Sequence, residues 1–361
     1  MGPLQGLKVV EMSAIGPVPL AGMLLADMGA DVVIIDKAND PFAMPSDVLR
    51  RGKRSVTVEI KSEEGAATVQ SLIDKADILL EGFRPGVMER LGFGPEDCQQ
   101  RNPGLIYGRM TGWGQDGPLS QAAGHDINYI ALTGALHAIG RAESNPVPPL
   151  NLVGDYGGGT MFLLMGVLAA LHERNHSGQG QVIDAAITEG TANLMSLFYT
   201  MHSIGAWQPR RGANLLDTAA PFYDTYETSD GGFISLGPIE PHFFALLKEK
   251  MQLDEDLFAE QNNPAKWPEQ KAALTTLVKT KTRDQWCELL EGSDACFAPV
   301  LDYLEAAEHP HMQARQAYIE IDGRLQPAPA PRFSRTPSEV SVPDTDDADL
   351  ETIYADWNVG Q

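Results

Sequence analysis

Two short polar stretches of the chain carry residue types that can do chemistry. The first, GHDINY, places His125 directly before Asp126 on the threshold of an apolar run. The second, NLVGDYGGG, places Asp155 four residues after Asn151 and just before three glycines. Imidazole and carboxyl groups exchange protons, and a helix start stabilises anions through its free N–H groups and its dipole. Both stretches are therefore candidates for proton transfer or for anion binding.

Each of these residues also has an ordinary explanation. Asp155 fits the N-cap of a helix, where Asp is common, and His125 fits a buried, hydrogen-bonded histidine. A third carboxylate, Glu240 in GPIEPHFF, stands before Pro241, at which a helix would begin. The residues by themselves leave both explanations open at all three positions.

The spacing of apolar residues predicts the strands and helices that must position His125 and Asp155. LKVVEM and ADVVIID are apolar strands separated by the helical segment VPLAGMLLADMG, which ends at Gly29. Continuous apolar strands alternating with helices predict a parallel, doubly wound α/β sheet. SVTVEI, ADILLEGF and LIYGRMTGW continue this alternation. GDYGGG is expected to form a glycine-rich turn before a long buried helix that ends at Gly178.

A change of composition predicts a second domain. FYDTYETSDGGFISLG alternates apolar and polar residues around a Ser-Asp-Gly-Gly turn, which indicates a hairpin. We expect a large domain over 1–190 and 325–361, linkers over 191–220 and 311–324, and a small domain over 221–310.

Composition limits the class of ligand and the compartment. With 49 acidic and 27 basic residues in 361, the formal charge is −22, which disfavours nucleic acid and anionic membranes as partners. Three widely spaced cysteines offer no zinc-site spacing, so no metal is expected. Without a recognisable signal peptide, and with the apolar run 161–171 too short to span a bilayer, we expect a cytoplasmic protein.

The first quarter of the chain carries the residues that argue for or against nucleotide binding. The loop SAIGPVP has one glycine where a dinucleotide fingerprint needs three, so a non-catalytic or NADP-linked nucleotide-binding protein is disfavoured. Cations are nevertheless frequent: Lys37, the LRRGKR segment, Lys61, Arg84 and Arg90. In so acidic a chain they indicate a phosphorylated ligand, the alternative being a solvated surface.

Several motifs together resemble one family. GHDINY, PPLNLVGDYGGGTMFLLMGVLAAL, SGQGQVIDAA, RGANLLD and PAPRFSRTP are similar to those of the α-methylacyl-CoA racemases of bacterial, mycobacterial type within the family III CoA-transferase superfamily. The resemblance runs nearly end to end. It implies an α/β fold with a Rossmann-like large domain, completed by the C-terminal segment, and a small α+β domain. It also implies an interlocked homodimer in which each active site uses both chains.

The resemblance implies roles for single residues. His125 and Asp155 correspond to the family's two acid/base groups, and Asn151 to the residue that hydrogen-bonds the aspartate. Glu240 corresponds to the glutamate that pairs with the histidine from the small domain of the other chain. The positions that correspond to CoA contacts are Lys37, Val58, Glu59, Ile60, Lys61, Gly82, Phe83, Arg84, Arg90, Gly124, Asp126, Ile127, Asn128 and Tyr129. Mycobacterial members have Arg where this chain has Lys37, which keeps the charge but loses the bidentate fork.

The implied reaction interconverts (R)- and (S)-2-methylacyl-CoA thioesters in lipid and fatty acid metabolism, with CoA as part of the substrate and no separate cofactor. His125 would serve one face of the α-carbon and Asp155 the other, while Glu240 would fix the imidazole tautomer. Because Gly157, Gly158 and Gly159 let the backbone approach closely at a helix start, we expect N–H groups near Asp155 to stabilise the enolate oxygen. The alternative is a family III CoA-transferase in which Asp155 attacks the thioester carbonyl.

An adaptable apolar surface is needed for the acyl tail, because Met side chains repack around varied shapes. The candidates are Met161, Met165, Leu194, Met195, Phe198 and Met201. An ordinary helical core explains the same residues equally well.

Overall fold

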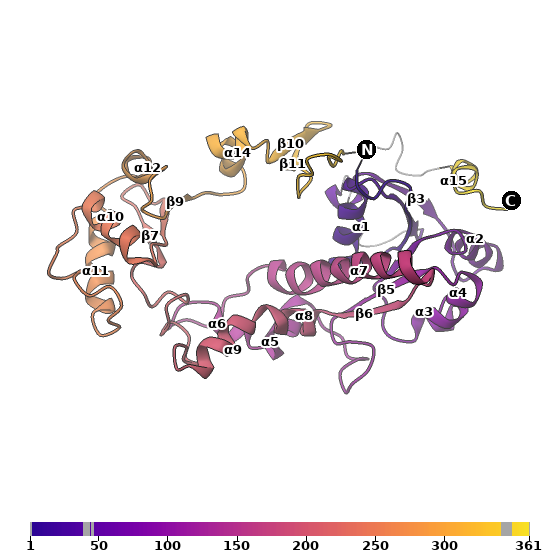
Figure 1. Cartoon of the computed structure of the whole chain (residues 1–361), viewed down its shortest axis with the longest axis horizontal. Coiled ribbons are helices and arrows are strands. Elements are labelled where there is room, and N and C mark those ends of the chain that lie inside the picture. Colours follow the sequence, from indigo (N-terminus) through magenta and orange to yellow (C-terminus); the bar gives the residue numbers. More distant parts are fainter. Residues whose placement is uncertain (1, 39–43, 45–46, 341–348, 361) are drawn as a thin grey trace. The chain divides into compact units, whose positions relative to one another are not determined.

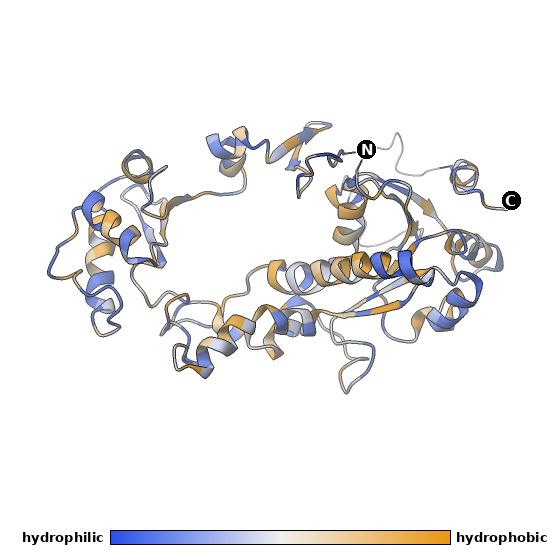
Figure 2. Ribbon diagram, in the orientation of Figure 1, coloured by the Kyte–Doolittle hydropathy of each residue, from blue (hydrophilic) through white to orange (hydrophobic). Residues whose placement is uncertain are grey.

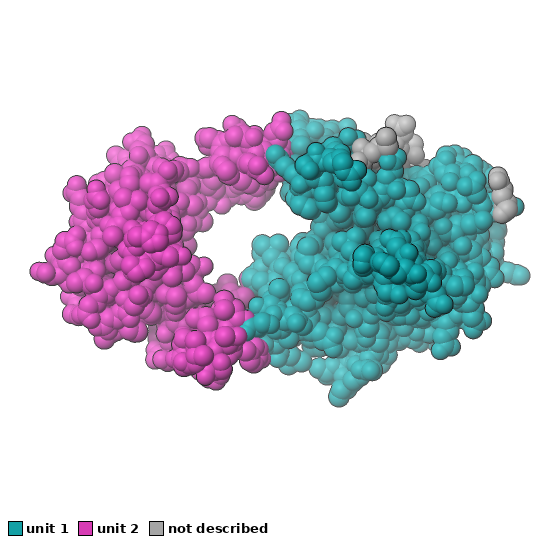
Figure 3. Space-filling model, in the orientation of Figure 1, with its two compact units in different colours: residues 1–135, 149–196, 319–361 teal, residues 136–148, 197–318 magenta. Residues whose placement is uncertain are grey.

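The computed structural model describes residues 2–38, 44, 47–340 and 349–360 (Figure 1). The chain divides into two compact units, coloured separately in Figure 3. Unit 1 comprises residues 1–135, 149–196 and 319–361, and unit 2 comprises residues 136–148 and 197–318. Each unit has a core of its own, so each is described separately.

Unit 1 is built on one six-stranded sheet. Its strands are β1 (Lys8–Met12), β2 (Asp31–Asp36), β3 (Lys53–Thr57), β4 (Ile78–Glu81), β5 (Ile106–Thr111) and β6 (Val182–Ala186). All pairings are parallel, and the order is β3-β2-β1-β4-β5-β6. The predicted parallel α/β sheet is confirmed. The order reverses direction between β1 and β4, and ligands of such sheets bind outside the carboxyl ends of the strands at that point.

Helices cover both faces of this sheet because successive strand residues point to opposite sides. Val9 packs with α1 (Pro17–Asp27) and α7 (Met161–Ser177) on one face. Val10 packs on the other face with α2 (Glu63–Ile73), α4 (Pro95–Arg101) and the C-terminal helix α15 (Leu350–Trp357). The remaining short helices of this unit are η1 (Val48–Arg50), α3 (Val87–Arg90), α5 (Asp126–Leu132) and α8 (Ile187–Leu194).

The GDYGGG segment is helical rather than a turn, which corrects the sequence-based expectation. Residues Leu152–Thr160 form a π-helix, η2, that continues without a break into α7. The glycines are needed for packing: a Cβ on Gly190 of α8 would lie 1.9 Å from the carbonyl oxygen of Gly158, and a Cβ on Gly158 would lie 2.3 Å from Thr191 Oγ1. The two helices therefore cross with their backbones almost in contact.

The combined helix 152–177 is longer than the apolar run 161–171 considered from sequence. By length and composition alone it could cross a membrane, with a mean hydropathy of 1.4. In unit 1, however, one side of α7 packs into the sheet core through Leu163, Val167 and Ala170. Figure 2 shows α7 as largely apolar except for its hydrophilic C-terminal turns.

We expect Gly190→Ala to destabilise unit 1. The new methyl group has no room between α8 and η2, so the helices must separate, and overpacking of this kind costs about 1–3 kcal/mol. Chemical denaturation measures the change in the free energy of unfolding. Gly104→Ala is the matched control, because the nearest heavy atom to its added Cβ would lie 3.7 Å away. Equal stability of the two variants would contradict the packing role.

Unit 2 contains a three-stranded antiparallel sheet of β7 (Asp224–Glu227), β8 (Phe233–Leu236) and β9 (Phe297–Val300). The predicted hairpin across the Ser-Asp-Gly-Gly turn is confirmed as the β7–β8 pair. Phe222, Phe244, Trp267 and Trp286 lie in its core. Its main helices are α10 (Pro241–Met251), α11 (Trp267–Val278) and α12 (Arg283–Leu290).

The remaining short elements belong to both units or connect them in sequence. They are α6 (Ala135–Ala138), α9 (Ser196–Ser203), α13 (Glu305–Glu308), α14 (Pro310–Ala314), β10 (Tyr318–Ile321) and β11 (Arg324–Pro327).

Candidate active site

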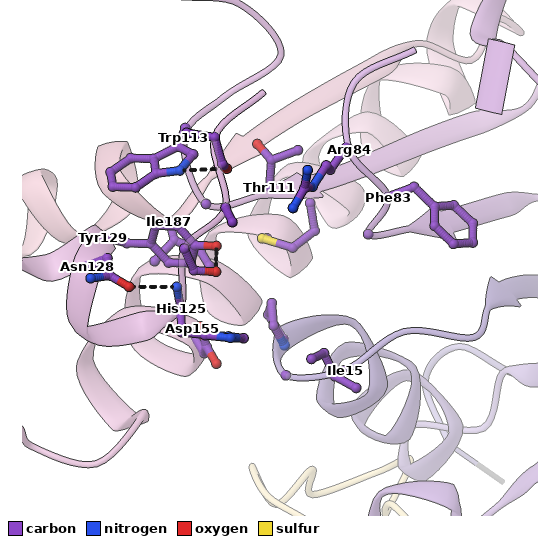
Figure 4. A pocket seen from close by; sticks show the side chains of 18 of the residues that line it. Ile15, Phe83, Arg84, Thr111, Trp113, His125, Asn128, Tyr129, Asp155 and Ile187 are labelled. Carbon is purple, nitrogen blue, oxygen red and sulfur yellow. Dashed lines mark hydrogen bonds between the residues drawn. The ribbon is translucent and has the colours of Figure 1, made fainter. Parts of the chain in front are cut away.

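A cavity of about 540 Å³ opens in unit 1 at the carboxyl ends of β1, β4 and β5 (Figure 4). Its walls are the segment 15–18 after β1, the segment 82–85 after β4, and the segments 110–113 and 120–125 around the loop that follows β5. Asn128 and Tyr129 of α5, Asp155 of η2 and Ile187 of α8 complete it. The cavity therefore lies where the strand order reverses, as expected for the ligand site of an open parallel sheet.

Asp155 is the fourth residue of η2 and lies inside the helix, so the N-cap explanation does not apply to it. Its carboxylate accepts a hydrogen bond from the side chain of Asn151. Burial, followed by the negative charge of Asp126, raises the pKa of Asp155 to about 6, while Asn151 and His125 act in the opposite direction. Near neutrality this carboxyl group can therefore both accept and donate a proton.

The start of α1 leaves room for the Asp155 carboxylate only because residue 16 is glycine. A Cβ on Gly16 would lie 2.9 Å from Asp155 Oδ2, and Gly16 has a φ of 75°, in the region that glycine favours. The loop SAIGPVP, which lacks a dinucleotide fingerprint, thus forms one wall of the cavity.

His125 is the N-cap residue of α5, and its extended backbone keeps the imidazole outside the helix. The Asn128 side chain accepts a hydrogen bond from the His125 N–H at 3.1 Å, and the Asn128 N–H donates to the His125 carbonyl at 2.8 Å. These two bonds fix the backbone at His125, as in a capping box. His125 and Asp155 lie beside each other on the cavity wall in Figure 4, and their charges interact.

Tyr129 and Trp113 hold the loop that leads into His125. The Tyr129 ring occupies the space that side chains would fill at Gly112 and Gly124, and its hydroxyl donates to the Gly124 carbonyl. Trp113 packs edge-on against Tyr129, with ring centroids 4.8 Å apart, and donates its indole N–H to the Ala122 carbonyl at 3.2 Å. Both side chains support the position of the imidazole.

The residues predicted to contact CoA fall into two groups. Gly82, Phe83, Arg84, Gly124, Asn128 and Tyr129 line the cavity. Lys37, Val58, Glu59, Ile60, Lys61, Arg90, Asp126 and Ile127 do not. Lys37 and the segment 58–61 follow β2 and β3 at the same edge of the sheet as the cavity, and Ile127 is 43% exposed.

The Gly82–Arg84 segment is anchored beneath the cavity by a buried carboxylate. The Phe83 N–H donates to Glu81 at 2.7 Å, and Arg109 binds the other oxygen of Glu81 at 2.9 Å. The end of β4 is therefore rigidly positioned, and Arg84 is carried to the cavity wall by the backbone that follows it.

The LRRGKR segment does not supply free cations to a phosphate. Its four basic residues form internal ion pairs, Arg50 with Asp36 at 2.5 Å, Arg51 with Asp27 at 2.6 Å, Lys53 with Glu11 at 2.7 Å and Arg54 with Asp31 at 2.5 Å. The high density of positive charge in this quarter of the chain thus serves largely to neutralise the acidic strand ends and helix α1.

Two groups of residues named in the sequence analysis lie outside the cavity wall. Gly157, Gly158 and Gly159 do not line the cavity, because they lie at the contact of η2 with α8 and α1. Met161, Met165 and Leu194 are 45%, 60% and 48% exposed and also lie outside the cavity.

Glu240 belongs to unit 2, where it is the N-cap residue of α10, with Pro241 at the first helical position. The segment before it is held by Gln261, whose side-chain amide donates to the carbonyls of Pro238 and Ile239, both at 2.9 Å. The Trp267 indole in turn donates to the Gln261 carbonyl at 2.8 Å. These hydrogen bonds fix the segment of unit 2 that precedes Glu240.

Sequence reasoning missed part of the cavity wall. Ile15–Val18 and Met110–Trp113 carry no motif, and Ser120 precedes the recognised GHDINY stretch. The signal that could have found the first two was positional. The first follows β1 and the second spans the end of β5, and both strands lie at or next to the point where the strand order reverses, at which loops converge on a ligand.

Comparisons with known proteins agree with this architecture. A model of the family described as CoA-transferase family III matches residues 4–345. The chain is 45% identical over 340 residues to the α-methylacyl-CoA racemase of Mus musculus, covering 94% of this chain and 88% of the mouse protein. It is 44% identical over 336 residues to the α-methylacyl-CoA racemase of Homo sapiens, covering 93% and 87%. A solved CAIB/BAIF family protein from Brucella suis has a TM-score of 0.80 at 26% identity, covering 99% of each chain.

The family match spans nearly the whole chain, and the solved relative shares its fold from end to end. The cavity at the reversal point of the sheet, with a histidine and an aspartate on its wall, lies within the matched residues. This protein is a member of CoA-transferase family III.

Proposed function

We propose that this protein is a racemase that interconverts (R)- and (S)-2-methylacyl-CoA thioesters by 1,1-proton transfer through an enolate. The observation that carries the proposal is that His125 and Asp155 both line one cavity, with the pKa of Asp155 raised to about 6. The racemase relatives at 45% and 44% identity support the same reaction.

The chemistry requires two different groups. A single base would tend to return the proton to the face from which it came, so inversion needs one group on each face of the α-carbon. In one direction Asp155 takes the proton while protonated His125 supplies another, and in the reverse direction the roles exchange. Asn151 orients the Asp155 carboxylate, and Asn128 fixes the backbone that carries the imidazole.

CoA is part of the substrate in this proposal, and the enzyme would use no separate cofactor. The pantetheine arm would enter past Gly82–Arg84, and the nucleotide would lie along the sheet edge near Lys37 and Val58–Lys61. The basic side chains Lys37, Lys61, Arg84 and Arg90 would offset the phosphates in a chain of net charge −22. We place the enzyme in the cytoplasm and in lipid metabolism.

We further propose that two chains interlock as a homodimer, with a Rossmann-like sheet in each and Glu240 of each small domain paired with His125 of the other chain. Unit 1 leaves an apolar surface exposed that a second copy would cover. This surface comprises Leu132, Leu150, Leu152, Met161, Met165 and Leu194, all at least 45% exposed. Large exposed apolar patches mark protein–protein interfaces in soluble proteins.

The test follows both the optical activity and the α-hydrogen of (R)- and (S)-2-methyldecanoyl-CoA in deuterated water. Racemisation with deuterium uptake at the α-carbon, without an added acceptor acid, is the expected result. The competing function is CoA transfer by nucleophilic Asp155, which would form a covalent mixed anhydride with the acyl group and release CoA. Mass spectrometry that finds an acyl adduct on Asp155, with no racemisation, would establish the transferase instead.

The rate of racemisation is expected to fall in acid with a midpoint near pH 6. The working pair carries one proton in either direction, and a second proton binds as the pH falls through the pKa of Asp155, which is raised to about 6. An ordinary aspartate would place this limb near pH ~4. Initial rates of both enantiomers between pH ~4 and pH ~8 measure it, and a limb near pH ~4 would contradict the raised pKa of Asp155.

A further inference from the structure

Asp126 follows the proposed acid/base residue His125, yet its side chain is directed into the protein. The residue is only 9% exposed and does not line the cavity. Its Oδ1 accepts the N–H of Asp155 at 2.7 Å, and its carboxylate also accepts the N–H of Gly154. These bonds join α5 to η2 at the residues that carry the two proposed reacting groups.

The contact between α5 and η2 leaves room for the Asp126 carboxylate because residue 154 is glycine. A Cβ on Gly154 would lie 2.2 Å from Asp126 Oδ1 and 2.7 Å from Ile130 Cγ2, so only glycine lets η2 approach α5 so closely. The second oxygen, Oδ2, is buried and has no hydrogen-bond partner among the residues that the structure describes. A buried carboxylate oxygen without a partner is unfavourable for folding, which indicates that the charge has another use.

We propose that Asp126 is a positioning residue, which clamps the backbone of Asp155 to α5 and presents its buried negative charge to the Asp155 carboxylate. This charge disfavours a second negative charge beside it, so Asp155 stays able to take up and return a proton at neutral pH. The inference rests on the proposed racemase function, because it explains how one of the two acid/base groups is adjusted to its task.

The charged surroundings of Asp155 support this role. The elements packed against this part of η2 present His125, Asp126 and Tyr129 from α5, Gly16 and Pro17 from α1, and Ile187 and Thr191 from α8. Among these, Asp126 supplies the negative charge and His125 the positive one. After burial, the charge of Asp126 is the largest cause of the raised pKa of Asp155.

The experiment compares Asp126→Asn with Asp126→Ala. Asparagine keeps the size and the oxygen acceptor for the Asp155 N–H but removes the charge, whereas alanine removes both. Asp126→Ser, a second neutral side chain with an oxygen acceptor, serves if the asparagine variant does not fold. Asp97→Asn, on the exposed side of α4, is the control for loss of one negative charge elsewhere.

Two readouts are used on the full-length protein. The first is the titration of the Asp155 carboxyl carbon by NMR in protein labelled with [13C]aspartate, with the signal assigned by its loss in Asp155→Asn. The second is the acidic limb of deuterium uptake by 2-methyldecanoyl-CoA. In Asp126→Asn both midpoints are expected to move about one pH unit lower. Asp126→Ala is expected to show the same shift together with a further loss of kcat, since the clamp is gone.

An Asp155 titration that is the same in Asp126→Asn, in Asp97→Asn and in the unmodified protein would overturn the inference, whatever happens to the rate. The NMR titration needs no substrate. A shifted titration in a protein that never exchanges the α-hydrogen would therefore refute the racemase function and leave the electrostatic role of Asp126 standing.

Discussion

Asp155→Asn and His125→Gln are each expected to lose racemisation, by at least ~10²–10⁴-fold, because each removes one of two groups that must act on opposite faces of the same carbon. Both substitutions preserve side-chain size, so the cavity of about 540 Å³ should persist. Polarimetry or circular dichroism of 2-methyldecanoyl-CoA measures the racemisation rate of each variant.

The more discriminating result concerns proton exchange without inversion. Each variant keeps one base, so each is expected to take up deuterium from only one enantiomer, and the two variants should favour opposite enantiomers. CoA binding, measured by calorimetry, should change little in either. If either variant still racemises at the rate of the unmodified protein, or if both exchange the same enantiomer, the two-base arrangement is wrong.

Matched control variants distinguish the loss of an acid/base group from a nonspecific loss of activity on substitution. His172→Gln changes an exposed histidine of α7 outside the cavity, and Asp97→Asn changes an exposed aspartate of α4. Neither residue lines the cavity, so both controls should racemise at the unmodified rate.

Lys53→Met is expected to cost about 3–5 kcal/mol of the free energy of unfolding. The Lys53 Nζ donates to both carboxylate oxygens of Glu11, at 2.9 and 2.7 Å, and to the Pro19 carbonyl at 2.9 Å. The two side chains are 0% and 2% exposed. Removal of the ammonium leaves a buried carboxylate without its counter-ion, and this desolvated charge is the source of the cost.

The paired variant Glu11→Leu/Lys53→Met tests that reasoning, because it removes both charges. It should be clearly more stable than Lys53→Met alone in urea denaturation, since replacement of a whole buried ion pair by apolar groups is often neutral or better. A double variant no more stable than the single one would contradict the expected interdependence. The Lys53–Glu11 pair contacts α1, and the first residues of α1 line the cavity. Unfolding of Lys53→Met should therefore also abolish racemisation.

Strands in both units could be predicted because the sequence patterns that specify them are local. LKVVEM, ADVVIID and SVTVEI are apolar runs of strand length between helical segments, and each became a strand of the parallel sheet. The hairpin around Ser229–Gly232 followed from turn residues between alternating strands. In each case the deciding interactions lie within a few residues of one another.

The glycine-rich segment shows where local signals fail. Three consecutive glycines indicate a turn, but Gly158 and Gly159 instead allow α8 and α1 to approach η2. The packing partner Gly190 lies about thirty residues away in the sequence, so the helical outcome depends on a contact that propensity does not contain. The ion pairs of the LRRGKR segment could not be predicted from local patterns either, because their carboxylate partners come from β1, α1 and β2.

By itself the sequence determined the strands of the parallel sheet, the hairpin of unit 2 and the two peptides in which the titratable groups stand. Tertiary structure alone decided which neighbour in each peptide faces the cavity: His125 lines it, whereas Asp126 is buried against the backbone of η2. The physical reason is that adjacent residues at a helix start point in different directions, and only the packing of α5, α1 and α8 around η2 fixes those directions. The same packing buries Asp155 beside a second carboxylate and so sets its proton affinity, a property of the assembled site rather than of the chain.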